Sequence, residues 1–179
     1  MRLRKNGGAG MSVIIDIDLT INGERHALSV AAETTLLGML RNQMGLTGAK
    51  LGCDVGDCGA CTVIVDGRSV NACLMLAPQV DGCEVLTIEG LATREQLHPL
   101  QRAFEEQGAL QCGFCGPGVI LSAKALLDLN PDPSRQEIRD GLAGNLCRCT
   151  GYTKMIEAVQ RAAREMRDRS DNTGVKRER

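Results

Sequence analysis

Hydrophobic positions follow two different periods along this chain, and the change between them falls near residue 90. Between residues 13 and 88 the apolar positions form short stretches separated by turn residues, which is typical of strands and hairpins. From Leu91 onward they recur at the 3.6-residue spacing of amphipathic helices. The pattern therefore predicts an α+β domain followed by an all-helical domain.

Turn signals divide the first half into two hairpins, one helix and a closing strand. Asn22-Gly23 and Asp66-Gly67 are dipeptides that favour two-residue hairpin turns, and Gly45 can end a helix. The expected elements are strands at residues 13–20, 25–30, 62–65, 68–70 and 84–88, and a helix from residue 34 or 35 to about 44.

The second half carries the signals of several short helices. Ser134 and Glu137 form a capping-box pattern, and the preceding segment, residues 130–133, contains two prolines that interrupt a helix. The expected helices lie at residues 97–107, 116–129, 134–141 and 152–166. Four helices of this length predict a small bundle.

The two ends of the chain lack these patterns. Residues 1–11 are basic and rich in glycine, and residues 167–179 are densely charged, so we expect a disordered leader and a disordered tail. The expected domains are therefore residues 12–89 and residues 90–166.

Composition and charge narrow the functional classes. Hydrophobic residues make up 43% and charged residues 24% of the 179 residues, which is ordinary for a globular protein. The net charge of −1 gives no support for a nucleic-acid partner. No stretch reaches the ~18 apolar residues of a membrane span, and residues 1–10 lack the apolar core of a secretory signal. We therefore expect a cytoplasmic protein whose cysteines stay reduced.

The chain has nine cysteines, and three of them fall close together as Cys53-x4-Cys58-x2-Cys61. This is the spacing of a plant-type ferredoxin loop, in which a fourth thiolate from further along the chain completes a [2Fe–2S] site. Cys73 is the candidate for that fourth ligand. Glycines beside these cysteines let backbone N–H groups approach the sulfurs closely. The spacing favours metal binding over disulfide bonds.

A second set of cysteines lies in the helical half, as Cys112-x2-Cys115 and Cys147-x-Cys149. Each pair precedes an expected helix, where the partial positive charge of the helix N-terminus favours thiolate over thiol. Four thiolates could hold a second iron–sulfur cluster or a structural zinc ion. The spacing alone does not separate the two, although the ferredoxin-type loop in the same chain favours a cluster.

Two longer motifs carry a family resemblance. Together with the first loop, residues 111–115 (Gln-Cys-Gly-Phe-Cys) and residues 145–152 (Asn-Leu-Cys-Arg-Cys-Thr-Gly-Tyr) resemble the iron–sulfur small subunit of the xanthine oxidase, or molybdenum hydroxylase, family. Carbon monoxide dehydrogenase and 4-hydroxybenzoyl-CoA reductase small subunits are similar. The resemblance covers roughly residues 13–164. One departure is Gly116, which stands where many members have threonine.

The resemblance implies a fold and a set of partners. The fold would be an N-terminal β-grasp plant-type [2Fe–2S] ferredoxin domain followed by an all-α four-helix domain with a second [2Fe–2S] cluster. The partners would be a large subunit with molybdopterin cytosine dinucleotide and a medium subunit with FAD, assembled as a dimer of heterotrimers.

The resemblance also implies roles for individual residues. The cluster nearer the flavin would be bound by Cys53, Cys58, Cys61 and Cys73, and the cluster nearer molybdenum by Cys112, Cys115, Cys147 and Cys149. Gln111 and Cys149 would lie against the pterin. Cys83 lies outside both sets, and we expect it to be a small apolar core residue.

The expected function is electron transfer from a molybdopterin site through two clusters to FAD, with substrate oxidation carried out in a partner subunit. Three alternatives remain at this point. They are a subunit of a reductive 4-hydroxybenzoyl-CoA reductase-type enzyme with reversed flow, a free ferredoxin-like carrier, and a zinc-stabilised interaction module. Asp54 and Asp57 are expected to be solvated loop residues, and His98 is expected to cap or pack at a helix start.

Overall fold

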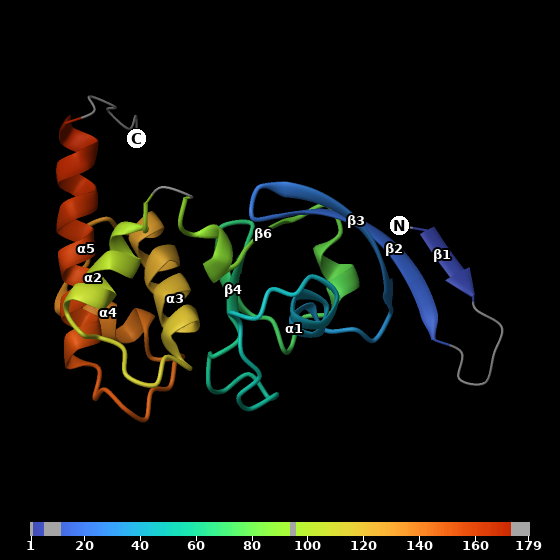
Figure 1. The fold of residues 1–179 in the computed structure, drawn as a ribbon, viewed down its shortest axis with the longest axis horizontal. Coiled ribbons are helices and arrows are strands. Elements are labelled where there is room, and N and C mark those ends of the chain that lie inside the picture. Colours follow the sequence, from blue (N-terminus) through green and yellow to red (C-terminus); the bar gives the residue numbers. More distant parts are fainter. Residues whose placement is uncertain (1, 6–11, 94–95, 173–179) are drawn as a thin grey trace.

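The computed structural model describes residues 2–5, 12–93 and 96–172. A sheet-containing part and a helical part lie side by side along the long axis of the molecule (Figure 1). The α+β part followed by a helical part agrees with the change of hydrophobic period near residue 90.

The first part contains a mixed sheet in which the strand order is β1-β2-β6-β4-β5, with β3 paired to β2. The strands are β1 (Arg2–Lys5), β2 (Val13–Ile21), β3 (Glu24–Ala31), β4 (Thr62–Val65), β5 (Arg68–Asn71) and β6 (Glu84–Leu86). Asn22 and Gly23 both have positive φ values, 52° and 82°, as the tight turn between β2 and β3 requires. Both predicted hairpins are confirmed, since β2 pairs antiparallel with β3 and β4 pairs antiparallel with β5.

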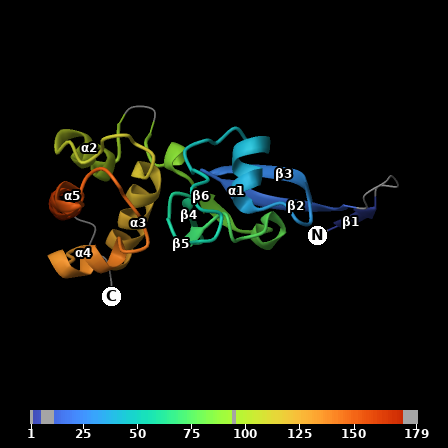
Figure 2. The ribbon, with the colours of Figure 1, turned by 90° about the horizontal axis from the view of Figure 1, so that it is seen from below.

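The helix predicted after β3 is present, although its second half is a π-helix, which is wound more loosely than an α-helix. It begins as α1 (Leu36–Gly38) and continues as a π-helical segment, Met39–Gln43. The Thr35 side chain accepts a hydrogen bond from the Gly38 N–H and caps the start. Figure 2 shows α1 over one face of the sheet. Its buried residues pack there with the apolar side chains of β2 and β4.

The second part contains helices close to the four predicted ranges. They are α2 (Pro99–Glu106), α3 (Gly116–Leu129), α4 (Arg135–Gly141) and α5 (Thr153–Asn172). The capping box is confirmed, because Ser134 Oγ accepts from the Glu137 N–H at 3.2 Å and Glu137 Oε2 accepts from the Ser134 N–H at 2.7 Å. Phe104, Val119 and Met155 are fully buried in the shared core of these helices. Within the described part of the chain, no helix combines the length and the apolar character needed to cross a bilayer.

Strand β4 is buried on both faces and joins the two parts. Val63 and Val65 point into the core of the sheet part, where they pack under α1. Ile64 points the other way and belongs to the core of the helical part. Helix α3 packs across β4 and β5 on that second face. A strand covered on both faces explains why residues 62–65 form an uninterrupted apolar run rather than an alternating one.

The predictions for the two ends were partly wrong. Residues Arg2–Lys5 form β1 and pair antiparallel with β2, because an edge of β2 offers unpaired backbone groups to any extended segment. Residues 6–11 lie outside the described residues. At the other end α5 continues to Asn172, well beyond residue 166. Two ion pairs support the C-terminal turns of α5. They join Arg169 to Glu165 at 2.9 Å and Arg167 to Asp132. Residues 173–179 again lie outside the described part.

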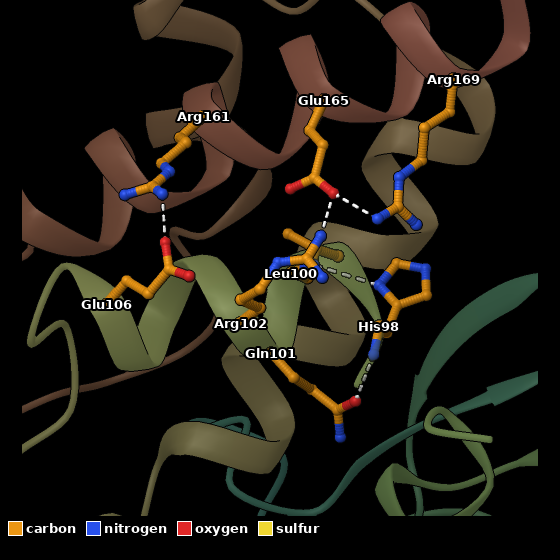
Figure 3. A network of polar contacts seen from close by, with 8 residues as sticks. All are labelled: His98, Leu100, Gln101, Arg102, Glu106, Arg161, Glu165 and Arg169. Carbon is orange, nitrogen blue, oxygen red and sulfur yellow. Dashed lines mark hydrogen bonds and ion pairs between the residues drawn. The ribbon is translucent and has the colours of Figure 1, made fainter. Parts of the chain in front are cut away.

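Ion pairs join α2 to α5 (Figure 3). Arg102 of α2 contacts Glu165, which also contacts Arg169 on its own helix, and Arg161 of α5 contacts Glu106. At the start of α2, His98 Nδ1 accepts from the Leu100 N–H at 3.2 Å. The expectation that His98 caps this helix is confirmed. Burial lowers the pKa of His98 to about 4, and the positive charges of Lys124 and Arg169 act in the same direction.

The capping role of His98 predicts a loss of stability in mild acid. Its folded pKa of about 4 lies below its ordinary value of 6.5, so the unfolded chain binds more protons between these two pH values. The stabilisation is therefore present above pH 6.5 and disappears as the pH falls toward 4. We expect a loss of ~1–2 kcal/mol, reduced from the full shift because the ring is partly exposed.

The measurement is urea unfolding at pH 7.5 and pH 5 for the wild type and for His98→Asn. Asparagine keeps an N-cap acceptor but does not titrate, so the variant should lose less stability over this range. An equal loss in both proteins would show that other groups cause the acid sensitivity.

Candidate metal centres

The first cysteine set lies in the loop that leads into β4. Cys53 and Cys58 interact through their side chains, and Cys61 interacts with Cys73, which follows β5. Cys61 also interacts with Cys58, which connects the two pairs. The structure therefore brings Cys73 to the other three cysteines, as the ferredoxin-type spacing suggested.

Hydrogen bonding and burial act differently on these thiols. Cys53 Sγ accepts from the backbone N–H groups of Val55 at 3.5 Å and Cys58 at 3.4 Å. These bonds lower the pKa of Cys53 to about 7, whereas burial raises the pKa of Cys61 to about 11. A bound cation would favour the thiolate form of both, because its charge outweighs the cost of burial.

Glycine is required beside the sulfurs of the first set. A Cβ on Gly52 would lie only 2.7 Å from Cys58 Sγ. Gly59 has a φ of +66°, and a Cβ there would lie 2.3 Å from the carbonyl oxygen of Gly144. A larger residue would therefore clash at both positions, at Gly52 with a sulfur atom and at Gly59 with the second loop.

The second cysteine set gathers between the starts of α3 and α5. Cys115 directly precedes α3, as predicted, and it interacts with Cys147 and Cys112. Cys149 Sγ lies 3.5 Å from Cys112 Sγ. Burial raises the pKa of Cys115 to about 12. Burial also acts to raise the pKa of Cys147, but hydrogen bonds outweigh it and lower the value, among them the Thr150 Oγ1 bond at 3.1 Å.

Both sets are arranged as two pairs of thiols. The pairs are Cys53 with Cys58, Cys61 with Cys73, Cys112 with Cys149, and Cys115 with Cys147. Among the described residues, no three His, Cys, Asp or Glu side chains converge on a position for a single metal ion. Pairs of thiols fit a diiron cluster, in which each iron takes two thiolates. All nine cysteines are free thiols in the structure.

One hydrogen bond connects the two sets directly. The Leu146 N–H donates to the carbonyl oxygen of Cys58 at 2.9 Å. Because Leu146 precedes Cys147, a member of the first set is joined to a member of the second by a short run of backbone and this bond. The Tyr152 hydroxyl supports the second loop from the other side, accepting from the Cys147 N–H at 2.7 Å and donating to the Asn145 carbonyl at 3.2 Å.

Comparisons with known proteins place both halves in families. The 2Fe-2S iron-sulfur cluster binding domain matches residues 19–112, and the [2Fe-2S] binding domain matches residues 87–160. The chain is 51% identical to the nicotinate dehydrogenase small FeS subunit of Eubacterium barkeri, covering 83% of this chain and 94% of that one. The chain belongs to the iron–sulfur small subunits of the molybdenum hydroxylase family.

Two further relatives show how such a subunit occurs. The quinoline 2-oxidoreductase structure from Pseudomonas putida 86 superposes with a TM-score of 0.83 at 44% identity, covering 87% of this chain and 97% of that chain. The aldehyde oxidoreductase of Megalodesulfovibrio gigas is 49% identical over 88% of this chain. The present chain spans only 18% of the length of that relative.

The remaining candidate residues of this iron–sulfur subunit differ in how far they are exposed to solvent. Gln111 and Cys149 are both exposed. Asp54 and Asp57 are exposed in the first loop, as expected of solvated residues. Cys83 is partly buried against the core of the sheet part and belongs to neither cysteine set, which agrees with its expected packing role.

Sequence reasoning missed the structural part played by Asn145. This residue was noted only as a member of a family motif, yet its side chain is buried at 3% exposure and bonds to the first loop. Its position next to Gly144 and two residues before Cys147 is only a weak sequence signal for burial. Its hydrogen-bond partners, Gly59 and Thr62, lie 86 and 83 residues earlier in the chain. Only the folded chain brings them together.

The close approach of Gly52 to Cys58 Sγ generates a prediction for cluster loading. In Gly52→Ala the added methyl group would press on Cys58 Sγ, so the first site should lose its metal while the second keeps it. We expect the iron content to fall to about half that of the wild type, since each site would hold one diiron cluster. Iron and sulfide analysis after reconstitution measures this.

Gly144→Ala is the matched control, because a Cβ at that position meets nothing within 4 Å. Its iron content should equal that of the wild type. Full loading of Gly52→Ala would contradict the assignment of this loop to a cluster.

Proposed function

We propose that this chain is the electron-transfer subunit of a molybdenum-dependent hydroxylase or dehydrogenase. Electrons from a molybdopterin site in one partner subunit would pass through two [2Fe–2S] clusters to FAD in another. The observation that carries this proposal is the Leu146 N–H bond to the Cys58 carbonyl at 2.9 Å, which connects the two cysteine sets. Two sites joined so closely suit transfer between them better than two independent structural metals.

Each cluster, when bound, takes up and returns one electron. The β-grasp ferredoxin domain would hold the cluster nearer the flavin through Cys53, Cys58, Cys61 and Cys73. The four-helix domain would hold the cluster nearer molybdenum through Cys112, Cys115, Cys147 and Cys149. This chain carries out no bond making on the substrate.

The surroundings of the sulfurs supply the tuning that such clusters need. Backbone N–H groups donate to Cys53, and the Thr150 hydroxyl donates to Cys147. Hydrogen bonds to sulfur favour the more negative, reduced state of a cluster, whereas burial disfavours it. The two sites have different donors, so their potentials would differ.

The relatives support the partners and the direction of electron flow. Nicotine 6-hydroxylase of Paenarthrobacter nicotinovorans has a small subunit 50% identical to this chain. Its name, like that of nicotinate dehydrogenase, describes an oxidation. A partner with molybdopterin cytosine dinucleotide would contact the exposed Gln111 and Cys149, and a second partner would hold FAD, in a dimer of heterotrimers. Nine reduced cysteines favour a cytoplasmic enzyme.

The ligand assignment is tested with Cys115→Ser, with Cys83→Ser as the control. The wild type should contain about four irons and four sulfides per chain, one diiron cluster in each domain. We expect Cys115→Ser to lose about half of the iron, because one cluster loses a ligand, and Cys83→Ser to keep all of it. Metal analysis and visible absorbance give the result. A colourless protein loaded with zinc would overturn the redox function.

Exposed apolar side chains around both cysteine sets generate a prediction about the partners. They are Leu51, Val55, Leu74, Phe114 and Leu146. Exposed apolar side chains that gather on a protein surface mark a site of contact with another protein. We expect Leu51→Asp combined with Leu74→Asp to keep iron but to lose the molybdenum and flavin that copurify with the tagged wild-type chain.

Leu129→Asp is the matched control, because Leu129 is 83% exposed at the end of α3 that is far from Cys115. Molybdenum and flavin should copurify with this variant as with the wild type. Retention of both cofactors by the double variant would show that the partners dock elsewhere.

A further inference from the structure

We propose that Asn145 is a positioning residue that fixes the separation between the two cysteine sets. This inference rests on the proposed function and goes beyond it, because it assigns a role in transfer between the clusters to a residue that binds no metal. The juxtaposition that supports it is a contact among the first loop, the second loop and α3.

The Asn145 amide bonds across the boundary between the two parts of the protein. Its Nδ2 donates to the Gly59 carbonyl at 3.0 Å and to Thr62 Oγ1 at 3.2 Å. The Thr62 hydroxyl in turn donates to the same Gly59 carbonyl at 2.7 Å. Asn145 and Thr62 are 3% and 4% exposed, so these bonds are shielded from water. Buried polar groups with each partner satisfied hold one geometry rather than several.

The backbones at this contact are pressed together without side chains between them. A Cβ on Gly118 of α3 would lie 2.2 Å from the Gly59 carbonyl oxygen. A Cβ on Gly59 would lie 2.3 Å from the Gly144 carbonyl oxygen and 2.6 Å from Asn145 Nδ2. An enlargement at Gly118 therefore has to move α3 away from the first loop, and an enlargement at Gly59 has to move the first loop away from the second.

Each participant lies close to a proposed cluster ligand in the sequence. Gly59 lies between Cys58 and Cys61, Asn145 lies two residues before Cys147, and Gly118 lies three residues after Cys115. Leu146, whose N–H bonds to Cys58, directly follows Asn145. A displacement of this contact would therefore change the distance between ligands of the two clusters. Electron tunnelling falls exponentially with distance, so a small displacement matters.

Packing elsewhere in the boundary offers a competing explanation. Helix α3 packs on β4 and β5, and Ile64 lies in the core of the helical part. If that packing alone set the arrangement, Asn145 would add stability without affecting the distance between clusters. A measurement of stability cannot separate the two explanations, whereas a measurement of the distance between clusters can.

The test uses the full-length chain in its complex, in the wild type and in two variants. Gly118→Ala inserts a methyl group against Gly59. Asn145→Asp keeps the shape of the side chain but turns an acceptor toward the Gly59 carbonyl in place of the donor. Gly144→Ala is the control, since its added methyl group has free space. Iron and sulfide contents are measured first, so that only fully loaded proteins are compared.

The readout is the magnetic interaction between the reduced clusters. Excess dithionite gives each cluster one electron and makes it paramagnetic, and electron paramagnetic resonance at low temperature records the splitting between the two centres. We expect the wild type and Gly144→Ala to show the same splitting. Gly118→Ala and Asn145→Asp should show a reduced or lost splitting at full iron content. Hydrogen exchange at the Leu146 amide, followed by mass spectrometry, should be faster in the same two variants.

The outcomes separate this inference from the proposed function. An unchanged splitting and unchanged exchange in Gly118→Ala and Asn145→Asp, with both clusters present, would overturn the positioning role and leave the proposed function intact. A wild-type protein without two reduced signals would overturn both. If Asn145→Asp fails to fold or load, Gly118→Ala and the milder Thr62→Val, which removes one hydrogen-bond partner of Asn145, decide the question.

Discussion

The hydrogen bond from the Leu146 N–H to the Cys58 carbonyl joins two loops that come from different halves of the protein. Each loop carries cysteines, and neither has enough regular structure to hold its own shape. The first leads into β4, and the second connects α4 to α5. Glycine at positions 59 and 118 lets the first loop meet the second loop and α3 backbone to backbone. The remaining architecture, a sheet with one covering helix and a group of helices, brings the two loops to this contact.

The thiols differ in ways that bear on metal uptake. The pKa of Cys53 is lowered to about 7 by backbone N–H donors, whereas burial raises the pKa of Cys61 to about 11 and that of Cys115 to about 12. At neutral pH the metal-free chain therefore keeps the Cys61 and Cys115 thiols protonated. Under the proposed ligand assignment, insertion of a cluster would displace those protons, because thiolate is the form that binds iron. The partly exposed Cys53 and Cys58 of the first set, and the exposed Cys112 and Cys149 of the second, are the ones best placed to meet incoming metal first.

The sequence predicted the local features of this protein well, for reasons that are visible in particular residues. Asn22-Gly23 and Asp66-Gly67 specify their turns through positive φ, and Ser134 and Glu137 specify a helix start, so these elements depend on neighbours in the chain. The cysteine spacing likewise determines which thiols can share a site. The helix boundaries at residues 116 and 129 agree with the structure for the same reason.

Features that depend on distant partners were not predictable in this way. Asn145 bonds to residues more than eighty positions earlier, and β1 exists through pairing with β2. The extension of α5 to Asn172 is supported by Asp132 and Glu165, so charge density alone gave the wrong expectation of disorder there.

Strand β4 contributes Ile64 to the helical core and Val63 and Val65 to the sheet core. Neither half could therefore melt while the other stayed intact, since unfolding of either would uncover one face of this strand. Calorimetry should accordingly record a single cooperative transition rather than two. Separating the two halves would leave the helical part with a hole where Ile64 packs and would expose an apolar side chain on the strand.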